Sequence, residues 1–201
     1  MLRPLVVLLA FGLTAKIAWT QTCVDVRAVD FRNAAIRTGA ADANEAGLLF
    51  GGAAPLTDGF ELRRGVALLR DDPEAAGSAP DWRVELVTDR KIHAGADTWV
   101  RVLLLEENHL SGTGLWEVVL AYACERGKLV RLFQFSGEGV SLMHLDAEKL
   151  QLYQALWKPS DPHCCPSRHV ELTYAWDAET HRYRRGGAVV RDGFVSVTDE
   201  R

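Results

Sequence analysis

Hydrophobic and polar residues alternate along much of the chain with a period of two, which is the spacing of a β-strand that buries one face. Alternation, or enrichment in β-branched and aromatic residues, marks five segments: 83–88, 99–105, 115–124, 128–135 and 169–176. The last segment places Val170, Leu172, Tyr174 and Trp176 on one side. Because such residue types favour strands, the pattern predicts a β-rich core.

Short glycine-containing turns separate the predicted strands. Arg126 and Gly127 lie between two of them, residues 137–139 contain two glycines, and Asp192 and Gly193 lie between two short apolar segments near the C-terminus. Strands joined by short turns of this kind pair as antiparallel hairpins. We therefore predict an all-β fold, mainly an antiparallel meander or hairpin sheet, with room for one short helix.

Three stretches depart from this alternation. Residues 38–47 and 71–81 have the small, polar and proline-containing composition of loops. Residues 146–156 allow two interpretations, because Asp146 could cap a helix while the leucines that follow alternate as in a strand. We expect a strand after a short turn.

The N-terminus has the layout of a secretory signal. A basic start at Arg3 precedes the apolar run 4–13, which is too short to cross a bilayer comfortably. We predict a signal peptide over residues 1–20 with cleavage after Thr20; cleavage after Ala15, or an uncleaved anchor, are the alternatives. The mature chain, residues 21–201, would be a single exported domain, periplasmic or secreted, with no membrane span.

Composition narrows the classes of partner. The chain has 201 residues, of which 48% are hydrophobic and 25% charged, as expected of one globular domain. Its net charge of −4 becomes −6 without residues 1–20, since 21 basic residues then stand against 27 acidic ones. Binding to nucleic acid normally needs a concentrated basic face, so we predict no nucleic-acid partner. We expect a monomer with a partner in the cell envelope or outside the cell.

Four cysteines are present, and export predicts that they are oxidised. They are Cys23, Cys124, Cys164 and Cys165. Three pairings are possible. A bond between Cys164 and Cys165 would be strained, because consecutive Cα atoms lie about 3.8 Å apart, below the usual disulfide span. We therefore favour two long bridges, in which Cys164 and Cys165 each join Cys23 or Cys124.

The segment 157–168 is the sharpest candidate for a site. It contains three prolines and two adjacent cysteines, so it is either a disulfide-fixed loop or a ligand site. His163, Cys164, Cys165 and His169 could bind copper or zinc as thiolates and imidazoles. Since oxidation removes thiolates, we predict no metal and no cofactor.

The sequence offers few candidates for catalytic residues or for aromatic residues that stack on a ligand. No Gly-x-Ser-x-Gly motif is present. Glu106 and Glu107 lie in a predicted loop and could act as an acid and base pair, although a solvated hairpin end explains them better in the absence of any further signature. Tryptophans 99, 116 and 176 lie in strand patterns that favour burial. Possible ligand contacts are therefore Trp82, Trp157, His163 and His169, and no catalytic residue is assigned.

The order of several motifs resembles a group of uncharacterised secreted bacterial proteins and lipoproteins. These motifs are Val29-Asp30-Phe31-Arg32-Asn33, the segment 56–65 ending in Arg64-Gly65, the strand 100–105, Gly112-Thr113-Gly114 before a Leu-Trp-Glu-Val-Val-Leu strand, and Cys164-Cys165-Pro166-Ser167 before Tyr174-Ala175-Trp176. The resemblance implies a β domain that is secreted or belongs to the bacterial envelope, and it brings no established activity. Where that group often has an Asp- and Gly-rich turn, this chain keeps only Asp97, so no calcium site is predicted.

The function that these observations favour is an exported, disulfide-stabilised, non-enzymatic domain that binds a partner or supports envelope structure. Two alternatives are a hydrolase of an envelope polymer that uses the loop carboxylates, and a Cys/His metal-binding protein.

Overall fold

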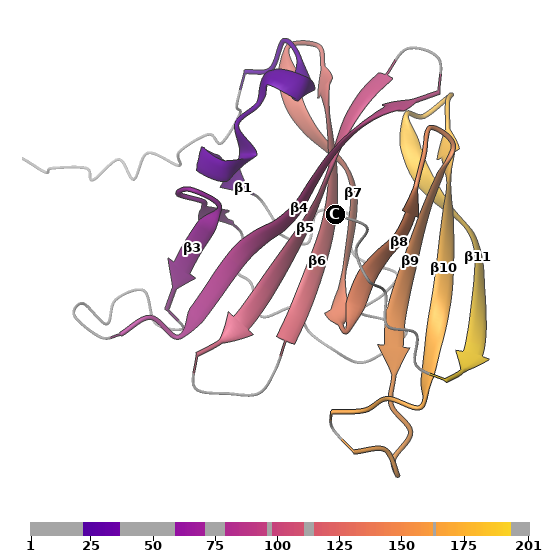
Figure 1. Ribbon diagram of the computed structural model, residues 1–201. Coiled ribbons are helices and arrows are strands. Elements are labelled where there is room, and N and C mark those ends of the chain that lie inside the picture. Colours follow the sequence, from indigo (N-terminus) through magenta and orange to yellow (C-terminus); the bar gives the residue numbers. More distant parts are fainter. Residues whose placement is uncertain are drawn as a thin grey trace, which may run out of the picture.

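The computed structural model describes residues 22–36, 59–70, 79–95, 98–110, 115–162 and 164–193. Within these residues the fold consists of β-strands and two three-residue 3-10 helices (Figure 1). The predicted signal peptide, the predicted loop 38–47 and most of the predicted loop 71–81 lie outside the described residues.

Two antiparallel sheets form most of the molecule (Figure 1). The five-stranded sheet has the order β3-β4-β5-β6-β7 and contains β3 (Val66–Leu69), β4 (Trp82–Ala94), β5 (Thr98–His109), β6 (Leu115–Glu125) and β7 (Lys128–Glu138). The four-stranded sheet has the order β11-β10-β9-β8 and contains β8 (Val140–Leu145), β9 (Lys149–Leu156), β10 (Arg168–Asp177) and β11 (Arg182–Asp192). The predicted all-β, antiparallel fold is confirmed.

The N-terminal part of the described chain is less regular. It contains η1 (Val26–Ala28), η2 (Phe31–Asn33) and the short pair β1 (Ala35–Ile36) and β2 (Phe60–Glu61). None of the helices among the described residues has the length and apolar content needed to cross a membrane.

The ambiguous segment 146–156 forms a turn followed by β9, so the expected strand is confirmed. The Asp146 carboxylate accepts hydrogen bonds from the backbone N–H groups of Glu148, at 2.9 Å, and Lys149, at 2.7 Å. Leu150 and Leu152 then face the core and are fully buried. Asp146 therefore caps a turn rather than a helix.

The connection from β7 to β8 differs from the predicted hairpin. The two strands lie at the edges of different sheets, and Gly139 alone joins them. Gly139 has a φ of +65°, and a Cβ at this position would lie 2.6 Å from Cβ of Ala155. The chain can turn from one sheet to the other here because glycine accepts a left-handed backbone and a close neighbour.

The five-stranded sheet is buried on both faces. On β5, Val100, Val102 and Leu104 belong to a core shared with the four-stranded sheet. Leu103 and Leu105 point the other way, into a second core with residues of the N-terminal segment. A strand buried on both faces has few positions for polar residues, which explains the apolar run predicted at 99–105.

Candidate binding groove

A groove of about 680 Å³ lies at the end of the molecule that is drawn uppermost in Figure 1. Four segments line it: 24–27 next to and within η1, 98–99 at the start of β5, 124–126 between β6 and β7, and 179–181 between β10 and β11. Loops from both large sheets and the N-terminal segment therefore meet at one place, which is where ligand sites commonly form.

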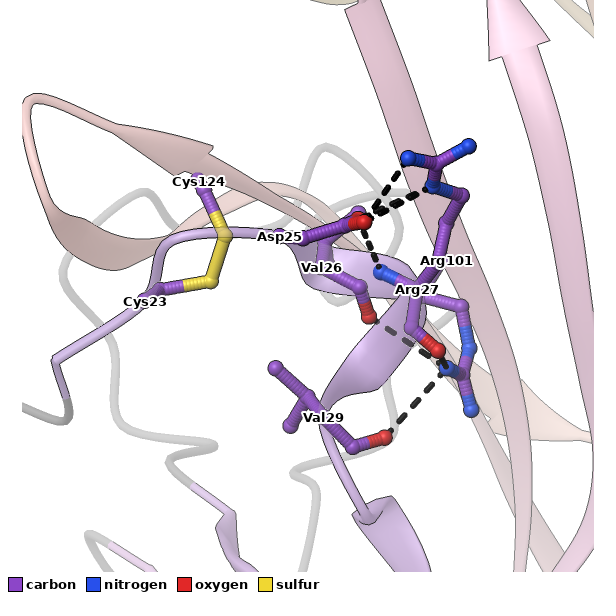
Figure 2. Close-up of a disulfide and its surroundings, with 7 residues drawn as sticks. All are labelled: Cys23, Asp25, Val26, Arg27, Val29, Arg101 and Cys124. Carbon is purple, nitrogen blue, oxygen red and sulfur yellow. Dashed lines mark hydrogen bonds and ion pairs between the residues drawn. A yellow bond between two sulfur atoms is a disulfide. The ribbon is translucent and has the colours of Figure 1, made fainter.

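The disulfide between Cys23 and Cys124 fixes one wall of the groove (Figure 2). Its Cα atoms are 5.3 Å apart, and the backbone N–H of Cys23 donates a 2.9 Å hydrogen bond to the carbonyl of Gly127. Cys23 is buried. The N-terminal segment is thus covalently attached to the end of the β6–β7 hairpin.

The guanidinium of Arg101, on β5, donates hydrogen bonds to backbone carbonyls of the same segment (Figure 2). Its Nη1 donates to the carbonyls of Val26, at 3.3 Å, Arg27, at 3.0 Å, and Val29, at 3.3 Å. Its Nε donates to Oδ1 of Asp89 at 2.6 Å. The guanidinium is almost completely buried, and it donates to three carbonyls within and just after η1, of which that of Val26 also accepts the N–H of Val29 at 3.3 Å.

Sequence reasoning missed Arg101 as a functional anchor. The available signal was a charged residue in the middle of an apolar strand, because such a residue must find partners in the interior.

Arg27, Asp25 and Trp99 form the charged and aromatic part of the wall. The Arg27 guanidinium lies 4.6 Å from the centroid of the Trp99 ring, within cation–π distance. It also donates to Asp25 through Nε at 3.0 Å and Nη2 at 2.8 Å. These hydrogen bonds lower the pKa of Asp25 and raise that of Arg27, so the pair stays ionised.

The β6–β7 and β10–β11 turns form the rest of the groove lining. Nη1 of Arg182 lies 2.6 Å from Oε1 of Glu125, which links the two turns. The His181 ring stacks on Trp176, with 6.1 Å between ring centroids. Hydrogen bonds from Thr180 lower the pKa of Asp177, which also accepts a hydrogen bond from the backbone N–H of Glu179 at 2.9 Å. This part of the lining is therefore held in shape by local contacts.

Trp99 is 37% exposed in this groove, so the predicted burial of Trp99 is wrong. Residue 99 stands at the beginning of β5, beyond the part of the strand that both cores cover. Trp116 and Trp176 are half-buried, and Trp176 packs against the shared core.

None of the predicted ligand contacts that the structure describes, Trp82, Trp157 and His169, lines this groove. Trp82 is half-buried at the start of β4 and meets the His109 ring edge to face, at 4.6 Å between centroids. The Trp157 ring lies near Gly139 and is half-buried. His169 is fully buried in β10, stacks on Tyr153 and donates from Nδ1 to the Gly193 carbonyl at 2.7 Å. His163 lies outside the described residues.

The favoured cysteine pairing is also wrong. Cys23 is bonded to Cys124, and Cys164 is bonded to Cys165. The reason is distance in the fold, because the loop between β9 and β10 lies at the end of the molecule opposite to η1 (Figure 1). Among the described residues, no group of three or more His, Cys, Asp and Glu side chains could hold a metal ion.

The predicted loop carboxylates lie in a strand instead. Glu106 and Glu107 belong to β5, where successive side chains face opposite sides of the sheet. Glu106 pairs with Glu117 across the strands and Glu107 pairs with Trp116. The two carboxylates therefore do not face a common cleft.

The five-stranded sheet contains a buried carboxyl group on each face, that of Glu107 on one and that of Glu117 on the other. Glu107 is fully buried, and neither of its oxygens has a hydrogen-bond partner among the described residues. Glu117 is 6% exposed and accepts a hydrogen bond from the backbone N–H of Val140 at 2.9 Å. Burial raises the pKa of each group to about 8.

No protein-family model, curated protein or solved structure matches this chain.

Proposed function

We propose that the protein is an exported binding domain whose ligand occupies the groove between η1 and the turns of the two sheets. The observation that carries this proposal is the partly exposed ring of Trp99, which lines the groove together with charged side chains of the η1 region and of the β6–β7 turn. Aromatic rings in a concave site with a few convergent polar groups are typical of small-molecule sites.

The chemistry of the walls favours a polar ligand that carries a flat apolar face, such as a saccharide. The exposed part of Trp99 offers a surface for stacking. Asp25, Arg27 and Glu125 offer charged acceptors and donors for hydroxyl groups. Their existing ion pairs hold these groups in place before a ligand arrives, which lowers the entropic cost of binding.

Location in an oxidising compartment is part of the proposal. The signal-like N-terminus favours export, and the resemblance to secreted bacterial proteins and lipoproteins points to the same compartment. A disulfide between residues 101 positions apart is compatible with it, since such bonds persist in the periplasm and outside the cell. The hydrolase and metal-binding alternatives have no specific observation in their favour among the described residues.

Titration of the full chain with soluble oligomers of N-acetylglucosamine and of glucose, followed by calorimetry and tryptophan fluorescence, tests the proposal. Aromatic stacking contributes about 0.5–1.5 kcal/mol, so Trp99→Ala should weaken binding by up to about tenfold. Trp82→Ala, at the other end of the five-stranded sheet, is the matched control and should bind normally. The proposal fails if no oligomer binds, or if both variants lose affinity equally.

A further inference from the structure

The two disulfides occupy opposite environments. Cys23 is 3% exposed and its bond to Cys124 joins residues 101 positions apart, with a Cα separation inside the usual range. Cys164 and Cys165 are both exposed, and their Cα atoms are 3.8 Å apart, below that range. Solvent and thiols can reach the adjacent pair, whereas the buried position of Cys23 protects the long-range bond.

The adjacent pair also does little to hold the chain together. In the chain-entropy model a disulfide restrains the unfolded chain more strongly when it closes a longer loop. A bond between neighbouring residues closes almost no loop. Breaking it should therefore leave the folded state intact.

Hydrogen bonds fix the surrounding loop without help from the sulfur atoms. Oδ2 of Asp161 accepts from the backbone N–H groups of Lys158, at 2.7 Å, and Ser167, at 2.8 Å, so it ties the two ends of the loop together. The backbone N–H of Cys165 donates to the carbonyl of Pro162 at 2.9 Å. The hydrogen bonds from Lys158 and Ser167 lower the pKa of Asp161, so its carboxylate remains charged and bonded near neutral pH.

We infer that Cys164 and Cys165 form a reversible thiol–disulfide exchange site, which accepts electrons from a dithiol while Cys23–Cys124 remains a structural bond. The exposed position and short Cα separation of the pair make it the more reducible of the two disulfides. This site is separate from the proposed groove and does not depend on it.

The exchange has two steps. A thiolate of the dithiol attacks one sulfur of the pair, the bond between the two cysteines breaks, and the other cysteine leaves as a thiolate that takes up a proton. The second thiolate of the reagent then attacks the mixed disulfide and releases the first cysteine, which is protonated in turn. Two electrons and two protons pass to the pair, and the dithiol becomes a disulfide.

Graded reduction of the full oxidised chain tests this assignment without any variant. The folded protein is treated with increasing dithiothreitol, quenched with iodoacetamide, digested and mapped by mass spectrometry. We expect Cys164 and Cys165 to be alkylated at a concentration about tenfold lower than Cys23 and Cys124, with the circular dichroism spectrum unchanged at that point. Removing the reagent and adding oxidised glutathione should restore the same pair.

A double variant provides the control. Cys164→Ser with Cys165→Ser should lose only the labelling at low reductant and keep the melting temperature of the parent. The assignment is overturned if all four cysteines are labelled together, if Cys23 and Cys124 are labelled first, if mapping finds Cys164 or Cys165 bonded to Cys23 or Cys124, or if reoxidation yields exchanged pairs.

Discussion

One face of the five-stranded sheet packs against a second sheet, whereas the other is covered by an N-terminal segment with two short helices and two short strands. The second sheet, β8 to β11, is stabilised by hydrogen bonds between its neighbouring strands. The described part of the N-terminal segment has one two-stranded ladder, and it is attached by the Cys23–Cys124 bond and by the buried Arg101. The N-terminal segment has few hydrogen bonds between strands, so it depends on one disulfide and one buried arginine to stay attached to the sheet.

The largest expected effect comes from Arg101, the noncovalent attachment of the segment. Arg101→Met keeps most of the side-chain volume but removes the guanidinium donor from Asp89 and from the carbonyls of Arg27 and Val29. Breaking a buried pair in this way should lower the free energy of unfolding by about 3–5 kcal/mol, measured by urea denaturation. Arg83→Met removes an exposed ion pair with Glu85 and should cost about 0–1 kcal/mol. Equal losses in the two variants would show that Arg101 is not an anchor.

Removing the covalent attachment should have the next largest effect. Cys23→Ser with Cys124→Ser should lower the free energy of unfolding by about 2–5 kcal/mol, the range for the loss of a native disulfide from a small domain. Hydrogen exchange should also accelerate in η1 more than in β9, because only the former is attached by this bond. Uniform acceleration in both elements would mean that the segment and the sandwich unfold as one unit.

The buried carboxyl groups give a pH-dependent effect on each face of the five-stranded sheet. Glu107 and Glu117 keep their protons in the folded state up to a pKa of about 8, whereas the unfolded chain loses them near 4.5. The folded state therefore binds more protons between these values, and stability should fall as the pH rises from about 4.5 to 8 and level off above it. The slope is at most about 1.4 kcal/mol per pH unit for each group.

Urea denaturation from pH 5 to pH 9 measures this slope. Glu107→Gln and Glu117→Gln should each flatten it, whereas Glu61→Gln, an exposed control, should not. The Glu107 and Glu117 variants should flatten it to a similar extent, because burial raises both pKa values to about 8. A parent protein whose stability is constant over this range would contradict the prediction.

The strands could be predicted from the sequence because each has a local signal, either alternation or an apolar run. The attachment of the N-terminal segment could not, since Phe31, Ile36 and Leu62 have no period that links them to the sheet they cover. Trp99 shows a second limit, because the alternation that marks a strand does not show where its neighbours stop covering it.

The cysteine pairing and the burial of Glu107 depend on which distant parts of the chain the fold brings together. Two long bridges were reasonable from loop lengths, but they would have to join opposite ends of the molecule. The sequence places Glu107 in a loop because it lies between two strongly apolar strands, whereas in the structure it pairs with Val84 of β4 and Trp116 of β6 inside the sheet.

The position of Cys23 has a consequence for biosynthesis. Chains are made from the N-terminus, and their earlier parts generally fold first. Cys23 and Cys124 are therefore both available before Cys164 and Cys165 have been synthesised. On a growing chain delivered to an oxidising compartment, the native long-range bond can form while no competing thiol is present, so the order of synthesis itself favours the correct partner.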